Sequence, residues 1–463
     1  MAAKRRTNRG RELRGSRRPR DHRLIGNSNQ HDGDPCNARA HPSSLCLDCL
    51  RSKEGGYDSL GRGRRGGSVS TKSVATDSAG KIKIARIITR MDLGGAQQAV
   101  LHLSRGLDTQ RFEQVVITGD GGLLLPELSA IQTIEHHVIP EMTRRIGPGG
   151  AVDDVRSVRR ICDILRRFRP NIVHTHTPKA GIVGRWAARL ARVPEIVHTY
   201  HGFGFSPRHP LWQKVFYVGL ERATARITSQ FVAVSDPNRA LGQSYGIFLR
   251  EKCALIRSGV EFCEFRTVRT DKSKKKIELG LKPSDKIVGV VASFTPAKAL
   301  HLFLEAAAKI AREVPGVSFV MVGDGSLRPE LEAQAGRLGI SSTLRMLGWR
   351  RDVPELLRTF DVFLLTSLWE GLPRSLVEAF LCGVPAVASH VDGIGEIVQE
   401  GRNGFLVPAN DTEAMTAAVV RLLKDEPLRK TMGEQALHSV DDYSVEKMLK
   451  DYSNLYENIS AAR

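Results

Sequence analysis

Residues 361–406 read DVFLLTSLWEGLPRSLVEAFLCGVPAVASHVDGIGEIVQEGRNGFL and contain the most informative pattern of the chain. The apolar run Val362–Leu365 predicts a strand, and the turn after it holds Glu370. A segment of helical period follows, carries Glu378 and stops at a glycine, and the apolar run 384–389 predicts a second strand. This order is typical of a parallel sheet. It places both carboxylates at the carboxyl edge, where such sheets bind ligands.

The spacing of the two glutamates separates several kinds of site. On one helix they would lie roughly 12 Å apart, more than the roughly 5 to 9.5 Å of a glycosidase acid/base pair, so a paired-carboxylate hydrolase is disfavoured. In one alternative, Glu370 and Glu378 accept hydrogen bonds from different hydroxyls of an extended, polyhydroxylated ligand. In the other, both are solvated acids near a helix N-terminus, where acids are favoured.

The wider string matches a known signature. The matching segments are 367–373, 378–380, 382–385, 396–398 and 403–406. In this order and spacing they resemble the retaining nucleotide-sugar glycosyltransferases of family 4. That resemblance implies the α/β GT-B architecture, two facing Rossmann-like domains with a central cleft. It also implies that Glu370 contacts the donor sugar, with Gly371 and Leu372 beside it, and that Glu378 contacts the ribose.

Composition sets broad limits on the protein. The chain has 463 residues, is 41% hydrophobic, and has no apolar run near the roughly 18 to 20 residues of a membrane-spanning helix. The seven cysteines are sparse and irregular, and no signal peptide pattern precedes them. We therefore expect a cytoplasmic protein, free or at the inner face of the cytoplasmic membrane.

The net charge of +19 is unevenly distributed. Residues 1–80 carry 17 Lys and Arg against 8 Asp and Glu, residues 81–250 carry 24 against 13, and residues 251–463 carry 28 against 29. A basic first domain suggests an anionic partner, either a membrane surface or a diphosphate-bearing acceptor. Nucleic acid competes as an explanation, but no nucleic-acid motif is present and few aromatics are available to stack bases.

Residues 1–80 are rich in Arg, Gly and Ser, which predicts a disordered basic tail. Cys46 and Cys49, with Cys36 and His41 nearby, are spaced somewhat like a zinc knuckle. The spacing fits no standard pattern, however, and we expect no zinc site. Two alternatives for the tail stay open: it touches a membrane, or it comes from an overextended reading frame.

The first predicted domain covers residues 81–253. The strand 82–88 leads through Gly94 and Gly95 into a helix, and a glycine turn before a helix N-terminus favours phosphate. The turn lacks the Gly-x-Gly-x-x-Gly fingerprint, so we do not predict NAD. The resemblance places both glycines at the cleft, near donor phosphates and acceptor.

Two further strands of this domain end in histidines: His174, His176, His198 and His201. Because His174 and His176 lie two residues apart and share a face, a metal site is one hypothesis, although no carboxylate accompanies them. The resemblance gives another account. His201 lies beside the reacting centre and the donor phosphate as a catalytic residue. His174 and His176 line the cleft on the acceptor side, with a structural role for the histidines other than His201 as the open alternative.

The sequence of this domain contains two basic segments that we expect to be helical. The arginine-rich helix 152–168 keeps its apolar residues on one face, which predicts a solvated arginine face. The segment 201–205, HGFGF, resembles a subgroup that acts on undecaprenyl-diphosphate-linked sugars. The basic, aromatic segment 207–226 after it either lies in a membrane interface or packs on its own domain, and the sequence leaves both open.

The second predicted domain, residues 254–440, alternates strands and helices as a second doubly wound sheet. We interpret 271–276 as a charged surface connection. Gly323, Asp324 and Gly325 end a strand, and their glycines would let a nucleotide approach.

One loop of this domain departs from the family pattern. Lys298 would neutralise the departing diphosphate as a point charge. Ser293 stands where the family typically has Arg, and Ala299 stands where it has Gly, which puts the diphosphate contact in question.

The resemblance implies a retaining glycosyltransferase that moves a hexose or N-acetylhexosamine from a UDP- or GDP-sugar to a lipid-linked or polysaccharide acceptor. We expect contact with an anionic membrane, no nucleic-acid partner, no cofactor and no metal, because no Asp-x-Asp site is present. The final segment 441–463 is expected to return to the first domain. Two alternatives remain: a non-catalytic sugar-nucleotide-binding protein, and a nucleotide-sugar epimerase of the same fold.

Overall fold

The structure, a computed structural model, describes residues 80–143, 148–205 and 210–461, which belong to one compact unit. The interpretations of the tail, its cysteines included, lie outside the described residues, as do residues 207–209 of the basic, aromatic segment. No helix among the described residues is long and apolar enough to cross a membrane.

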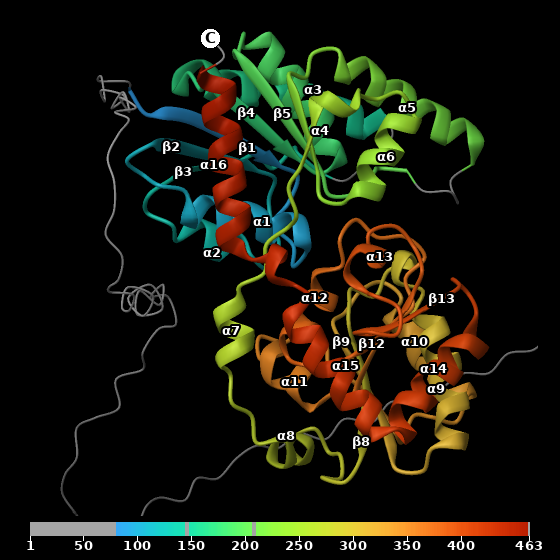
Figure 1. The fold of residues 1–463 in the computed structure, drawn as a ribbon. Helices are drawn as coiled ribbons and strands as arrows, with labels where there is room; N and C mark the ends of the chain where they lie inside the picture. The colour runs from blue at the N-terminus through green and yellow to red at the C-terminus, as the bar shows by residue number, and fades with distance from the viewer. Residues whose placement is uncertain (1–79, 144–147, 206–209, 462–463) are drawn as a thin grey trace, which may run out of the picture. The chain divides into compact units, whose positions relative to one another are not determined.

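The first half of the described chain forms a seven-stranded parallel sheet in the order β3-β2-β1-β4-β5-β6-β7 (Figure 1). Its strands are β1 (Ile82–Ile88), β2 (Phe112–Thr118), β3 (Glu135–Val138), β4 (Ile172–His176), β5 (Glu195–Tyr200), β6 (Gln230–Ala233) and β7 (Cys253–Leu255). Its helices are α1 (Gly95–Gly106), α2 (Leu125–Ser129), α3 (Pro148–Phe168), α4 (Pro178–Leu190), α5 (Leu211–Ala225), α6 (Asp236–Ser244) and the 3-10 turn η3 (Arg250–Lys252).

Helices cover both faces of this sheet, which explains its continuous apolar strands. Ala85 and Ile87 of β1 pack with residues of α3 and α4 on one face. Ile84 packs on the other face with α1 and with α16 (Val445–Ala461), through Met448 and Tyr452. Because side chains alternate along a strand, both faces must be apolar, as in doubly wound folds.

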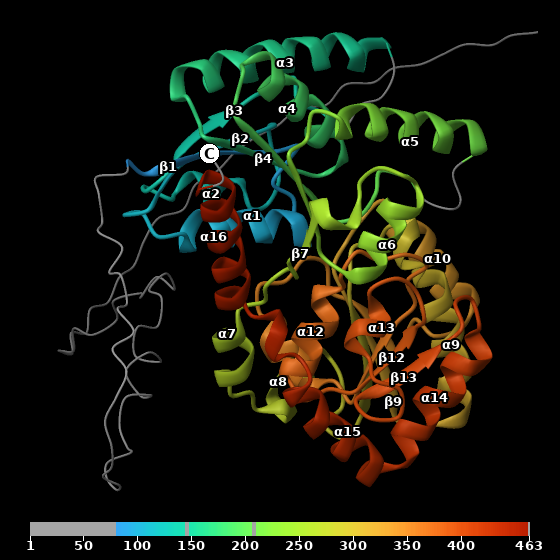
Figure 2. The ribbon, with the colours of Figure 1, turned by 45° about the horizontal axis from the view of Figure 1, so that its top comes forward.

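The C-terminal helix α16 packs against the first sheet, beside α1 and β1 (Figures 1 and 2). We placed the end of the first domain at residue 253, but β7 continues to Leu255, because Ala254 and Leu255 pair with β6. The last strand of the first sheet therefore runs two residues past our boundary.

The second half forms a six-stranded parallel sheet in the order β10-β9-β8-β11-β12-β13. Its strands are β8 (Lys286–Val291), β9 (Val317–Val322), β10 (Leu344–Met346), β11 (Val362–Leu365), β12 (Ala386–Ser389) and β13 (Gly404–Val407). Its helices are α7 (Phe262–Thr267), α8 (Lys272–Glu278), α9 (Leu300–Glu313), α10 (Arg328–Arg337), α11 (Val353–Thr359), α12 (Arg374–Leu381), α13 (Ile394–Ile397), α14 (Thr412–Lys424) and α15 (Glu426–His438), with the 3-10 turns η4 (Pro296–Lys298) and η5 (Asp441–Tyr443).

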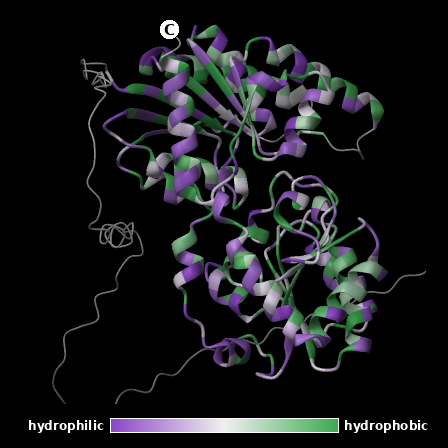
Figure 3. Ribbon diagram, in the orientation of Figure 1, coloured by the Kyte–Doolittle hydropathy of each residue, from purple (hydrophilic) through white to green (hydrophobic). Residues whose placement is uncertain are grey.

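The strand order predicts where each sheet binds a ligand. The order reverses at the first strand of each: β1 lies between β2 and β4, and β8 lies between β9 and β11. Ligands bind at the carboxyl ends of strands at such switch points. Figure 3 shows hydrophobic colour concentrated on the strands of both sheets, in agreement with their buried side chains.

One local prediction was wrong. The segment 271–276, interpreted as a surface connection, begins the helix α8. Asp271 is its N-cap, and the carboxylate accepts hydrogen bonds from the backbone N–H groups of Ser273 and Lys274, both at 3.1 Å. This capping satisfies N–H groups that a helix start leaves without partners, and it outweighs the repulsion within the lysine run.

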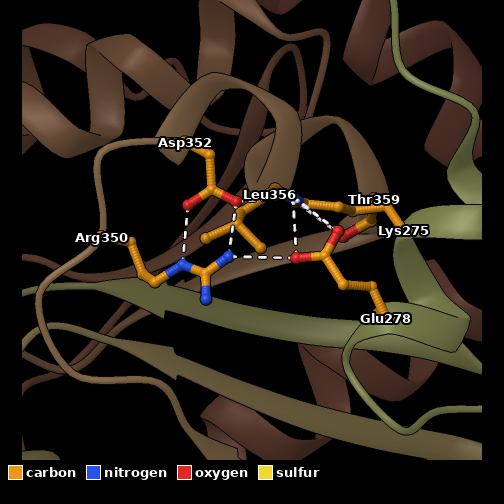
Figure 4. Close-up of polar contacts among 6 residues, drawn as sticks. All are labelled: Lys275, Glu278, Arg350, Asp352, Leu356 and Thr359. Atoms are coloured by element: carbon orange, nitrogen blue, oxygen red, sulfur yellow. Dashed lines mark hydrogen bonds and ion pairs between the residues drawn. The ribbon is translucent and has the colours of Figure 1, made fainter. Parts of the chain in front are cut away.

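A network of charged side chains then holds α8 against the loop before α11 (Figure 4). Arg350 donates two hydrogen bonds to Asp352, at 2.7 and 2.6 Å, and Lys275 Nζ reaches Asp352 at 2.5 Å. Glu278 accepts from both cations. Arg350 and Lys275 together lower the pKa of Asp352 well below its usual range.

Candidate active site

The structure contains the predicted strand, turn, helix and strand of residues 361–406. Glu370 lies in the turn after β11, and its side chain is only 8% exposed. Its Oε1 atom accepts from Lys298 Nζ at 2.5 Å and from Ser367 Oγ at 2.7 Å. The backbone N–H of Glu370 donates to Asp392 Oδ2 at 2.7 Å. The structure thus brings together two of the three predicted catalytic residues, Glu370 and Lys298.

Glu378 lies in the middle of α12 and is partly buried. Burial raises the pKa of its carboxyl, and the charge of Arg374 opposes that rise. Its carboxylate takes part in no hydrogen bond or ion pair within the described chain, so it is available as an acceptor for a ligand hydroxyl. Leu372, between the two glutamates, packs against the core of the second sheet.

The loop after β8 contains both positions that depart from the family pattern. Ala299 has φ of +43° and precedes α9, a backbone conformation that glycine adopts without cost. Ser293 Oγ lies 3.5 Å from Thr295 Oγ1 and supplies no charge. Lys298 is therefore the one cation of residues 292–299, and it is already paired with Glu370.

Gly323 and Gly325 lie where two loops of the second sheet approach each other closely. A Cβ on Gly323 would lie 2.0 Å from the carbonyl oxygen of Ala292, and one on Gly325 would lie 2.4 Å from that of Phe294. The glycines therefore let two backbone loops pack together, and their contact with a nucleotide stays a prediction. The Asp324 carboxylate accepts from Arg328 at 2.9 Å.

At the first sheet, Gly94 and Gly95 begin α1 as predicted. Gly94 is the N-cap and makes no side-chain cap, so the first backbone N–H groups of α1 lack a side-chain acceptor there. A Cβ added to Gly95 would lie 3.4 Å from Cδ of Arg374, a residue of α12. The glycine turn thus lies against the helix that carries Glu378.

The histidines of β4 form a buried chain rather than an acceptor surface. His174 is fully buried, and its two ring nitrogens bond Tyr456 Oη and Thr199 Oγ1, both at 2.7 Å. Our prediction that His174 contacts the acceptor is therefore wrong, because no ring nitrogen is free. His176 is also fully buried and lies behind His201, with Nδ1 3.1 Å from His201 Nε2.

His201 lies in the turn after β5 and is only partly buried. Its Nδ1 atom is enclosed and has no hydrogen-bond partner among the described residues. Burial lowers the pKa of His201 to about 3, and the charge of Arg374 acts in the same direction. His201 is therefore neutral at physiological pH, and its ring adds no positive charge to the site.

The four histidines do not converge on a metal position. His174 bonds two hydroxyls, and His198 Nδ1 bonds Thr175 Oγ1 at 2.8 Å. Within residues 80–143, 148–205 and 210–461, no group of three His, Cys, Asp or Glu residues could hold a metal ion. The alternative of a histidine metal site therefore has no geometric support.

Sequence analysis missed several residues that connect the loops of the two sheets. Glu396 accepts from the backbone N–H of Asp236 at 2.5 Å and from Arg257 Nη2 at 3.0 Å. Arg374 donates to the side chain of Gln98. Arg374 is the one basic residue in 362–382, which could have signalled its importance. Glu396 begins the matching segment 396–398, but that pattern does not indicate its contacts with Asp236 and Arg257.

Fold and site together define a two-domain enzyme class of the GT-B type, in which two Rossmann-like sheets bring their switch-point loops to one site. Two family models match the chain: Glycosyltransferase Family 4 over residues 93–262, and Glycosyl transferases group 1 over residues 271–439. The chain belongs to glycosyltransferase family 4, and it is a glycosyltransferase.

Named relatives agree with this assignment. The chain is 31% identical over 379 residues to the UDP-Gal:alpha-D-GlcNAc-diphosphoundecaprenol alpha-1,3-galactosyltransferase of Escherichia coli, covering 81% of this chain and 97% of that protein. It is 24% identical over 308 residues to the N,N'-diacetylbacillosaminyl-diphospho-undecaprenol alpha-1,3-N-acetylgalactosaminyltransferase of Campylobacter jejuni, covering 65% of this chain and 80% of that protein. Neither relative supports the epimerase or the non-catalytic alternative.

A solved structure supports the fold. The crystal structure of Anabaena Alr3699/HepE in complex with UDP and glucose aligns with a TM-score of 0.70 at 24% identity, over 81% of this chain and all of that one. At this identity the match concerns the fold alone. It confirms the GT-B architecture that the sequence predicted.

Proposed function

We propose that this glycosyltransferase transfers a hexose or N-acetylhexosamine from a UDP-sugar to an undecaprenyl-diphosphate-linked glycan, with retention of configuration. The observation that carries this proposal is the pair of Lys298 with Glu370 of the loop after β11, followed along the chain by the carboxylate of Glu378, which has no partner among the described residues. Carboxylates suit sugar and ribose hydroxyls, and an ammonium suits a diphosphate. The names of the Escherichia coli and Campylobacter jejuni relatives support the donor and the acceptor class.

The proposed roles follow from the contacts. Glu370 accepts from a sugar hydroxyl, while Lys298 holds Glu370 and faces the donor phosphates. Glu378 accepts from the ribose, and His201 lies beside the reacting centre. Gly371 and the α1 start at Gly95 bring backbone N–H groups near the phosphates.

The proposed reaction needs no side-chain base. The acceptor oxygen forms a bond to the anomeric carbon as the bond from that carbon to the phosphate oxygen breaks. The acceptor proton passes to the departing phosphate. Lys298 and backbone N–H groups stabilise the charge that develops there, so we propose that the reaction needs no metal ion.

Transfer assays test the proposal. Purified protein is incubated with UDP- and GDP-sugars, with and without undecaprenyl-diphosphate-linked acceptor, and nucleotide release is followed with EDTA present. We expect acceptor-dependent release from one UDP-sugar, and its loss in Glu378→Ala and His201→Ala while the circular dichroism spectrum is kept. Release that ignores the acceptor, or wild-type turnover in either variant, would contradict the proposed roles.

We further propose that the protein contacts an anionic membrane through the first half of α5. Leu211, Trp212, Val215 and Phe216 are 60 to 76% exposed and lie on the first two turns of this helix, which Figure 3 shows with hydrophobic colour. Exposed apolar residues that gather in this way mark an interaction surface.

The anchoring of α5 explains which part is left exposed. Glu221, the single acidic residue of the helix, is buried and accepts from Arg185 Nη2 at 2.8 Å and from Tyr200 Oη at 2.7 Å. The charge left at the surface of α5 comes from Lys214 and Arg222. Apolar and cationic side chains on one helix suit the interface of an anionic bilayer.

Vesicle sedimentation tests this contact. We expect binding to phosphatidylglycerol vesicles that weakens with salt, and at least tenfold weaker binding in Trp212→Ser with Phe216→Ser. The control, Leu123→Ser with Trp349→Ser, removes two exposed apolar residues outside α5 and should bind as wild type does. Equal losses in both double variants would overturn the assignment to α5.

A further inference from the structure

Arg374, the first residue of α12, is buried with most of its charge unsatisfied. Its side chain is 9% exposed, Nη1 donates to Gln98 Oε1, and Nε is enclosed without a partner. Within the described parts of the chain no carboxylate lies within 4.0 Å of it. Glu378, Glu264 and Glu261 act on it electrostatically from further away, but burial outweighs them and lowers the pKa of Arg374.

Such a position is costly unless something else supplies negative charge. A guanidinium stays charged, and a buried charge without a close counter-ion destabilises a fold. The chain solves this problem differently for Arg185, which pairs with Glu221. Arg86 is also buried, but it lies within β1 beneath the ring of Tyr456, 6.0 Å from the ring centroid. Only Arg374 of these three lies at a switch-point loop.

One side of Arg374 faces the positive end of a helix. Its Cδ atom lies against Gly95, at the start of the 12-residue helix α1, whose N-cap Gly94 gives no side-chain cap. The N-terminus of a helix carries a partial positive charge and N–H groups that need acceptors. A guanidinium and a helix N-terminus repel each other, and an anion between them would satisfy both.

The other cation of the site is already engaged. Lys298 pairs with Glu370 at 2.5 Å, and Ser293 in the same loop is uncharged. We propose that Arg374, together with the N-terminus of α1, binds the diphosphate group of a substrate. This inference rests on the proposed function for the identity of that substrate. Two substrates carry the group: the nucleotide donor and the lipid-linked acceptor.

The first experiment compares ligands that contain a diphosphate group with one that does not. The affinities of pyrophosphate, UDP and uridine are measured by calorimetry for the wild type, Arg374→Gln and Arg374→Lys. We expect Arg374→Gln to weaken pyrophosphate and UDP by about 10- to 100-fold and to leave uridine unchanged, because charge-assisted hydrogen bonds to phosphate are lost. Arg374→Lys keeps the charge but loses the planar pair of N–H donors of the guanidinium. Its affinities for pyrophosphate and UDP should therefore lie between those of the wild type and Arg374→Gln.

Two control variants separate anion binding from domain packing. Gln98→Ala removes the side chain that accepts a hydrogen bond from Arg374 but keeps the guanidinium, and should keep UDP affinity within about threefold. Arg351→Gln removes an exposed arginine that also connects the two halves, through Glu127 at 3.2 Å. It should bind UDP as the wild type does. If Gln98→Ala weakens UDP as much as Arg374→Gln, or if uridine is weakened as well, the residue holds the structure together and the inference fails.

Steady-state transfer distinguishes the two sources of diphosphate. If Arg374 holds the donor, KM for the UDP-sugar rises in Arg374→Lys; if it holds the acceptor, KM for the undecaprenyl-diphosphate-linked substrate rises instead. Either result supports a diphosphate site, and unchanged KM values with unchanged pyrophosphate affinity would overturn it. Pyrophosphate binding that depends on Arg374 in a protein without transfer activity would refute the proposed function and keep this inference.

Discussion

Gly371 lies directly against His201: a Cβ on Gly371 would come within 2.0 Å of the carbonyl oxygen of His201. The two residues come from the loops of different sheets, one next to Glu370 and the other after β5. The absence of a side chain at Gly371 therefore lets the loop of Glu370 approach the loop of His201, the two residues for which we propose donor-binding and catalytic roles.

We predict that Gly371→Ala separates these loops. Overpacking of this kind typically costs about 1 to 3 kcal/mol, and transfer should fall at least tenfold because both partners of the site move. Thermal unfolding and nucleotide release measure the two effects. The matched control is Gly336→Ala in α10, where nothing lies within 4 Å of the added Cβ, and which should gain about 1 kcal/mol.

Acid should destabilise the protein steeply, because buried histidines must become charged. Burial lowers the pKa of His102 and His201 to about 3, and those of His174, His176 and His198 well below 6.5. The unfolded chain therefore binds more protons below pH 6.5, and the stability present above that pH is lost as pH falls toward 3. Each histidine adds about 1.4 kcal/mol per pH unit to the slope.

Urea unfolding at pH 7.5, 6.5 and 5.5 measures this slope. His102→Gln should reduce this dependence of stability on pH by the contribution of one histidine. The exposed His438→Gln serves as the control and should leave it unchanged. Stability that stays constant over this range would show that the buried histidines accept protons in the folded state.

Glu378→Gln should raise stability and remove activity together. Burial raises the pKa of Glu378, so the folded state favours the protonated form and the ionised carboxylate costs stability at neutral pH. The cost appears as pH rises through the carboxyl range and is absent in acid. We expect a higher melting temperature at pH 7.5 but not at pH 4, and transfer reduced about 10- to 100-fold. A lower melting temperature at pH 7.5 would show that Arg374 outweighs burial.

Tyr456→Phe tests how the C-terminal helix supports the histidine chain. The hydroxyl lies 2.7 Å from His174 Nδ1, and both residues are fully buried. Removing it leaves a buried polar atom unpaired, which costs about 1 to 3 kcal/mol. Tyr245→Phe, whose hydroxyl takes part in no hydrogen bond within the described chain, should cost less than 0.5 kcal/mol, about the size of a surface change. Equal effects in the two variants would mean that α16 stabilises the sheet by packing alone.

Local pattern was enough to predict much of this protein. The apolar runs at 82–88 and 362–365 predicted parallel strands, and the turn and helix that follow each run were present in the structure. Glu370 and Glu378 were predicted at the carboxyl edge, because edge position follows from chain order in a parallel sheet. The lysine run at 271–276 was misjudged, because the capping carboxylate of Asp271 outweighed the charge pattern.

The tertiary structure alone decided which side chains meet. Lys298 and Glu370 are 72 residues apart, and His174 and Tyr456 are 282 apart, yet each pair shares a hydrogen bond. The sequence by itself determined the fold class and the edge that binds ligands, because periodicity reports which face of each element is buried. Only the folded chain assigned His174 to structure and left Arg374 without a counter-ion, because a side chain's partners depend on distances that no local pattern records.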